Sequence, residues 1–192
     1  MALTTKLEAV NIMISVIGES PVNTLSGTSV PVTVTQAVHA LDETSKAIQS
    51  EGWHFNTEYD YPLVPDASTS KITLPLNTLK VDLDPEIYTD SDPVQRGTKL
   101  YDRKNHRDTW TKDLKAIITF ELDFEELPEQ FRHYIAVKSA RIFAARFLGS
   151  REIEGFALRD EIEAKARAIE SDSENADRTI FDNYSVLRVL DR

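Results

Sequence analysis

The chain has 192 residues, of which 41% are hydrophobic and 28% charged, as in ordinary globular proteins. It contains no cysteine, which excludes disulfides, thiolate metal sites and cysteine nucleophiles. Its net charge is −10, from 32 acidic and 22 basic residues, so a protein that grips nucleic-acid phosphates is not expected.

Two helices are predicted in the N-terminal part of the chain. Apolar residues at alternating spacings of four and three predict a first helix over Thr4–Ile17, which Gly18 ends. The same spacing predicts a second helix over Val32–Glu51, closed by Gly52. Because the link between them is short, we expect the two helices to form a hairpin.

The spacing of apolar residues changes to two between residues 53 and 127, which is typical of half-buried strands. One alternating run spans Leu79–Leu83, and a second spans Ile118–Phe124. Five prolines fall in this stretch and indicate turns and strand edges. A small antiparallel sheet or sandwich is therefore predicted here.

Helices return over Pro128–Leu148 and over residues 150–171. The third helix is apolar over more than half of its circumference, and its remaining face carries basic residues: Arg132, Lys138, Arg141 and Arg146. The fourth has an apolar stripe, predicted to face the core, and an acidic face. The stripe consists of Leu158, Ile162, Ala166 and Ile169, and the acidic face of Asp160, Glu161, Glu163 and Glu170.

These elements predict an α+β protein. An antiparallel four-helix domain, residues 1–52 and 128–192, is interrupted by a β-rich domain, residues 53–127. The C-terminal segment from Asp172 onward carries several apolar residues, among them Phe181 and Tyr184. We interpret it as a docked tail or as an arm that reaches another chain.

No metal, phosphate or cofactor site is expected. The four histidines are far apart, and neither a P-loop nor a GxGxxG motif is present. The one candidate for catalysis is a group of carboxylates beside two aromatic residues: Asp123, Glu125, Glu126 and Glu129. Asp123 and Glu125 fall on one face of the predicted strand, at a spacing that a glycosidase could use. Among 32 acidic residues, however, such pairs arise often by chance.

The basic face of the third helix and the acidic face of the fourth have two interpretations. They could pair within one bundle, or they could meet across a head-to-tail interface between copies of the chain. The candidate contact residues are Arg132, Lys138, Arg141, Arg146, Phe181 and Tyr184. The pattern itself does not choose between the two.

Several blocks of sequence resemble the tail tubular protein A family of short-tailed bacteriophages. In chain order they read SVIGESPV (15–22), IQSEGWHFN (48–56), LYDR (100–103), ELPEQFRHYI (126–135), AARFLG (144–149) and EIEG (152–155). The resemblance implies a helical domain with a β-structured insert. It also implies a structural role in a virion tail, as a dodecameric adaptor ring between the portal and the nozzle, which is built from tail tubular protein B.

The same resemblance implies that double-stranded DNA passes through the ring without specific binding, and that tail fibres attach near the nozzle. An acidic chain suits such a conduit, because like charge reduces phosphate contacts. Assembly is expected in the cytoplasm of a bacterial host, with no membrane involved, since the chain begins with no signal-peptide pattern and contains no long apolar run. A bifunctional tail protein that also hydrolyses host polysaccharide is the alternative.

Overall fold

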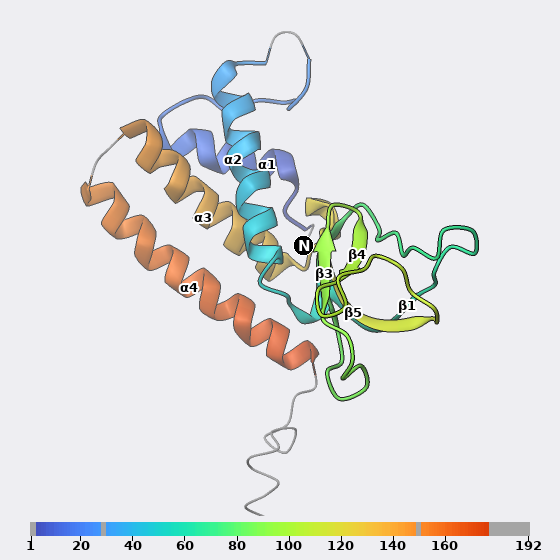
Figure 1. Ribbon diagram of the computed structural model, residues 1–192. Helices are drawn as coiled ribbons and strands as arrows, with labels where there is room; N and C mark the ends of the chain where they lie inside the picture. The colour runs from blue at the N-terminus through green and yellow to red at the C-terminus, as the bar shows by residue number, and fades with distance from the viewer. Residues whose placement is uncertain (1–2, 28–29, 149–150, 177–192) are drawn as a thin grey trace, which may run out of the picture. The chain divides into compact units, whose positions relative to one another are not determined.

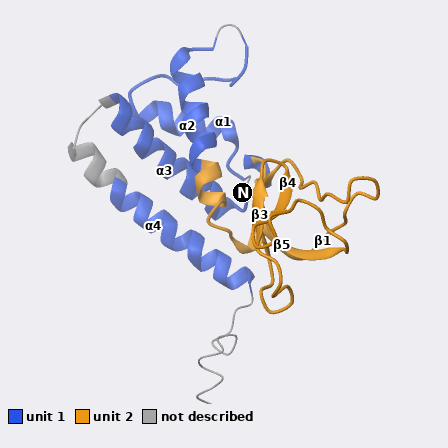
Figure 2. Ribbon diagram, viewed as in Figure 1, with its two compact units in different colours: residues 1–44, 124–192 blue, residues 45–123 orange. Residues whose placement is uncertain are grey.

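The computed structural model describes the backbone of residues 3–27, 30–148 and 151–176, and the side chains of these residues apart from 148 and 151–157. Along the described chain, two α-helices precede an insert of short strands and two follow it (Figure 1). The chain divides into two compact units, residues 1–44 with 124–192, and residues 45–123 (Figure 2). The predicted α+β class is confirmed, with strands between the second and third helices forming small antiparallel sheets.

The helical unit contains α1 (Lys6–Val16), most of α2 (Val32–Gln49), a short 3-10 helix η2 (Phe124–Glu126), α3 (Glu129–Leu148) and α4 (Arg151–Asn175). Helix α3 contacts both α1 and α4. The core of the helical unit is formed by apolar side chains of all four helices and by Phe124 of η2. The largest of these are Met13, Ile14, Leu41, Phe131, Tyr134 and Phe143.

Both ends of α1 are fixed by local sequence. At its start, Thr5 and Glu8 form a capping box, in which each side chain accepts the other residue's backbone N–H. At its end, Gly18 has φ of +83°, and the N–H groups of Gly18 and Glu19 donate to Ser15 and Ile14. This is a Schellman motif, which requires a left-handed residue and so favours glycine.

The link between α1 and α2 covers residues 17–31, one residue more than the predicted helix ends leave, and it is not a short link. It folds back on α1 through Asn11, whose amide group donates to the carbonyl oxygen of Val22 and accepts from the N–H of Val22, at 3.0 and 2.8 Å. The expectation of a short link between these two helices is therefore wrong. A side chain of the helix, rather than a short turn, holds this connection.

The insert contains a three-stranded antiparallel sheet and a two-stranded ribbon. The order in the sheet is β1 (Thr57–Leu63), β5 (Leu114–Phe120) and β2 (Thr78–Leu83). The ribbon pairs β3 (Pro93–Arg96) with β4 (Lys99–Asp102), and the 3-10 helix η1 (His54–Asn56) precedes β1. The apolar core of the insert includes Ile72, Leu74, Leu100, Trp110 and Ile118.

One detail of the strand prediction needs correction. Strand β5 ends at Phe120, so the alternation through Leu122 and Phe124 does not continue the strand. Phe124 instead lies in η2, where its side chain is buried. In β2 the predicted alternation is present, because Val81 and Leu83 are buried and Lys80 and Asp82 are exposed, and the register shifts just before it, between Thr78 and Lys80. A bulge of this kind adds one residue to a strand and interrupts the period of two.

Candidate functional site

Two of the four carboxylates considered for catalysis, Glu125 and Glu129, lie at the N-terminus of α1. Glu129, the first residue of α3, accepts from the N–H of Thr4 at 2.8 Å and from its hydroxyl at 2.5 Å. Glu125 accepts a longer bond, 3.4 Å, from the N–H of Lys6. Together with Glu8, which accepts from the N–H of Thr5, these groups satisfy three successive backbone donors. Negative charge at this position also stabilises the helix dipole.

The geometry assumed for a glycosidase pair is absent. Asp123 and Glu125 do not share a strand face, because β5 ends at Phe120 and Glu125 belongs to a 3-10 helix. Asp123, Glu125 and Glu126 are exposed and Glu129 is half-buried, and Glu125 and Glu129 accept from backbone N–H groups at the start of α1. The prediction of a shared strand face is wrong, and hydrolysis of polysaccharide stays an untested alternative.

Arg132 was a candidate for contact with a partner, but its side chain is buried within the helical unit, at 5% exposure. Its guanidinium group donates to three carbonyl oxygens: Leu127 at 2.7 Å, Thr4 at 2.9 Å, and Glu125. Arginine suits this position because its planar fork offers several donors in fixed directions. The three acceptors lie before α1, in η2 and before α3, so Arg132 holds these segments together.

The other basic residues of α3 lie nearer the surface. Arg141 forms an ion pair with Glu161 of α4, and the two side chains are only 21% and 13% exposed. This pairing follows the first interpretation of the charged faces, in which they meet within one bundle. Arg146 pairs with Glu43 of α2 at 3.3 Å, and both are more than half exposed. Lys138 lies against the ring of Tyr134, 5.5 Å from its centroid.

The candidates Phe181 and Tyr184 lie outside the described residues. Their proposed role as an arm is therefore neither supported nor opposed by the structure.

Helix α4 presents a different face to α3 than its apolar pattern predicts. Ala164 and Ala168 are buried, at 3% and 0% exposure, on the same side as Glu161. The large apolar residues Leu158, Ile162 and Ile169 are 46%, 63% and 44% exposed. The prediction that this stripe packs on the core is wrong. Small side chains let α3 and α4 approach closely, and the apolar stripe faces outward.

A second surface feature is a groove between α2 and α3. It has a volume of about 480 Å³ and lies within the helical unit. Its lining combines apolar side chains with a polar rim: Gln36, His39, Ala40, Glu43, Phe143, Arg146 and Phe147. The rings of Phe143 and Phe147 pack against each other with centroids 4.6 Å apart. Phe147 is 46% exposed, so the groove offers an aromatic surface to another molecule.

Within the described part of the chain, no helix is both long and apolar enough to cross a membrane. No group of three or more histidine, aspartate or glutamate side chains among these residues is arranged to hold a metal ion. In the helical unit, the outward stripe of α4 and the groove between α2 and α3 are two surfaces suited to binding another protein.

A comparison with protein families identifies the kind of protein that carries these surfaces. The family model described as tail tubular protein matches residues 7–178 of the chain. The chain belongs to the tail tubular protein family. A comparison with curated proteins gave no match. Membership makes the chain a structural component of a phage tail, whose partners are other tail components, and it confirms the resemblance seen in the sequence.

Two of the sequence blocks that carried the resemblance have a structural explanation in this tail tubular protein. The first spans the end of α2 and the start of the insert. The buried amide of Gln49 donates to the carbonyl of Leu122 at 3.0 Å and accepts from the N–H of Leu122 at 2.8 Å. Asn56 donates to the carbonyls of Gln49 and Phe120, at 2.9 and 2.8 Å. These two amides tie the end of α2 to the segment that leaves β5.

The second block contains Asp102, whose carboxylate is fully buried at the end of β4. It accepts from the N–H groups of Asp92, Lys104 and Asn105 and from the Asn105 side chain. The loops on either side are also joined by exposed residues, because the ammonium group of Lys104 donates to the backbone carbonyl of Thr89. Asp102 is therefore the centre of a hydrogen-bonded loop cluster in the insert.

The Asp102 cluster predicts how the stability of the insert changes with pH. Burial acts to raise the pKa of Asp102, but the hydrogen bonds from Asn105, Asp92 and Lys104 outweigh it and lower the pKa below 3.8. A lowered pKa in the folded state contributes stability that is present above about pH 4 and is lost as the pH falls through the folded value. Urea unfolding, followed by tryptophan fluorescence, is expected to show this loss below pH 4.

The matched variant is Asp102→Asn, which keeps the shape but replaces one acceptor oxygen with a donor. We expect it to lower the free energy of unfolding of the insert by about 2 kcal/mol at neutral pH and to flatten the decline below pH 4. The exposed Asp66 is the comparison, because bonds from Ser68 and Thr69 lower its pKa to about 2. Because the pKa of Asp66 is also lowered, Asp66→Asn is expected to flatten part of the decline below pH 4 as well, but as an exposed residue it is expected to change stability at neutral pH less than Asp102→Asn. If the free energy of unfolding of Asp102→Asn falls below pH 4 as steeply as that of the wild type, Asp102 does not cause the decline.

Proposed function

We propose that this tail tubular protein is the adaptor subunit that forms a closed ring between the portal and the nozzle of a short-tailed phage. The observation that carries the proposal is the outward apolar stripe of α4, in a chain that belongs to a family of tail structural proteins. Exposed apolar patches of this kind mark protein–protein contacts, and a subunit that functions only in an assembly leaves such surfaces uncovered when alone.

In this proposal the helical unit makes the contacts between subunits and with the portal, and the insert faces the nozzle protein and the tail fibres. The ring is dodecameric, and the C-terminal segment with Phe181 and Tyr184 reaches a neighbouring subunit. Double-stranded DNA passes through the ring during ejection. The net charge of −10 supports this, because an acidic conduit reduces contacts with phosphates.

The test is the solution mass of the chain alone and after it is mixed with the purified portal of the same phage, measured by analytical ultracentrifugation. We expect a complex in which several copies of the chain are bound to each portal. A chain that stays monomeric with the portal at every concentration contradicts the proposal.

A further inference from the structure

The stripe on α4 is a narrow apolar surface that the rest of the described chain does not cover. Leu158, Ile162, Ala166 and Ile169 recur at spacings of four and three, which places them on one side of the helix. From the first to the last, they extend over about 17 Å. Ile162, near the middle, has the highest exposure at 63%. An aliphatic side chain in this position gains free energy when a partner removes it from water.

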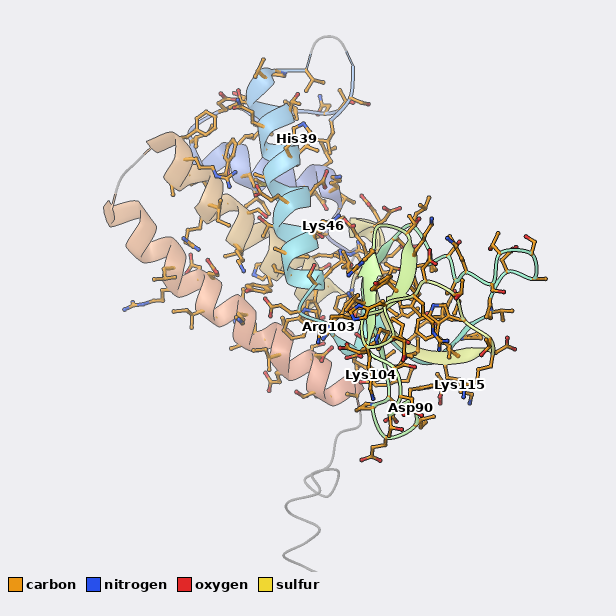
Figure 3. The ribbon with its side chains drawn as sticks, in the orientation of Figure 1. His39, Lys46, Asp90, Arg103, Lys104 and Lys115 are labelled. Carbon is orange, nitrogen blue, oxygen red and sulfur yellow. The ribbon has the colours of Figure 1, made fainter. Side chains whose placement is uncertain are left out.

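The groove between α2 and α3 complements the α4 stripe, because it is concave and has an apolar floor. Ala40 and Phe143 form its apolar floor at 3% and 1% exposure, and Phe147, 46% exposed, supplies most of its accessible apolar surface. His39 lies at its α2 side (Figure 3). Its lining residues extend over two turns of α2, from Gln36 to Glu43, which is long enough to take side chains from successive turns of a second helix.

The charges around the two surfaces also match. The C-terminal end of the stripe is acidic, because Glu170 and Glu174 are exposed and the described part of α4 has no basic residue after Arg167. The rim of the groove holds Arg146, whose side chain is 56% exposed. Its ion pair with Glu43 lies at the surface, where such pairs contribute little and exchange readily.

We propose that the α4 stripe of one copy of the chain docks into the α2–α3 groove of a second copy. The stripe and the groove are different surfaces of the same helical unit, so each copy can dock on one neighbour and receive another. Such a contact is heterologous, and it closes into a ring when the rotation between copies allows. This inference rests on the proposed function and names the surfaces that join its subunits.

The absence of cysteine from the chain allows a direct test by disulfide cross-linking. Ile162→Cys marks the stripe and His39→Cys marks the groove, and the two single variants are mixed in the presence of the portal and oxidised. We expect a disulfide-linked dimer in the mixture, with a much lower yield from either variant alone. Asp160→Cys, on another exposed face of α4, is the matched control for the stripe and is expected to cross-link poorly with His39→Cys.

A second variant tests the contact without cross-linking. Ile162→Asp is expected to weaken assembly at least tenfold, by about the free energy of burying one isoleucine side chain, with an unchanged circular dichroism spectrum. Equal cross-linking through positions 160 and 162 overturns the inference, as does a dimer of Ile162→Cys alone in the same yield as the mixture. If portal-bound assemblies form without the expected cross-link, the docking inference fails and the proposed function stands. If no assembly forms with the portal, both fail.

Discussion

Replacement of Arg132 by alanine is expected to lower the free energy of unfolding of the helical unit by about 3 to 4 kcal/mol. The guanidinium group is buried and donates to the carbonyls of Leu127, Thr4 and Glu125. Its loss leaves these three acceptors without their charged donor and creates a cavity where α1, η2 and α3 meet. Denaturant unfolding followed by far-ultraviolet circular dichroism measures the effect, because all four helices lie wholly or mainly in this unit.

Two further variants separate the hydrogen-bonding role of Arg132 from general effects of substitution on α3. Gln130→Ala changes an exposed residue on the same turn and is expected to shift stability by less than about 0.5 kcal/mol. Arg132→Lys keeps the charge but loses the planar fork, so it is expected to fall between wild type and Arg132→Ala. If Arg132→Ala is as stable as Gln130→Ala, the structural role assigned to the guanidinium group is wrong.

Asn56 is expected to be the most sensitive polar residue of the insert. Its side chain is 2% exposed, donates to the carbonyls of Gln49 and Phe120, and accepts from the N–H of Trp53. Asn56→Ala removes all three bonds and leaves buried backbone groups unsatisfied, at a cost of about 3 kcal/mol. Both tryptophans, Trp53 and Trp110, belong to the insert, so unfolding followed by tryptophan fluorescence reports on this unit.

The matched control is Asn77→Ala. Asn77 is exposed and its side chain donates to one carbonyl, that of Glu121, at 3.0 Å. Because water replaces that bond, we expect a loss of no more than about 1 kcal/mol. Equal destabilisation by the two substitutions contradicts the view that the buried amide of Asn56 holds η1 to the end of β5.

The helices were predictable from sequence because their signals are local. The spacing of apolar residues predicts the start of α2 at Val32, where the structure also has it. Gly18 and Gly52 adopt the positive φ angles that favour glycine just after a helix. Central strand β5 was also recognisable from Ile118 and Phe120, up to the point where the chain turns into η2. The end of that strand depends on the burial of Phe124 in the helical unit, which no local pattern encodes.

The roles of the candidate site residues were less predictable, because their partners are distant in sequence. Glu129 and Arg132 bind Thr4, more than 120 residues away, and only the fold shows that these charges serve the start of α1. The sequence pattern predicts the apolar stripe of α4, but it does not predict that the stripe faces outward. A period of three and four shows that Leu158, Ile162 and Ile169 share a face, whereas burial of Ala164 and Ala168 shows that another face packs on α3.

The most direct test of the proposed adaptor role is cryo-electron microscopy of the chain assembled on its portal. We predict a closed ring in which the α4 stripe of every copy, centred on Ile162, lies in the α2–α3 groove of the next copy. Single chains bound to the portal without touching one another would contradict the account. A ring in which the α4 stripe faces solvent or the DNA channel would support the adaptor role and contradict the proposed docking contact.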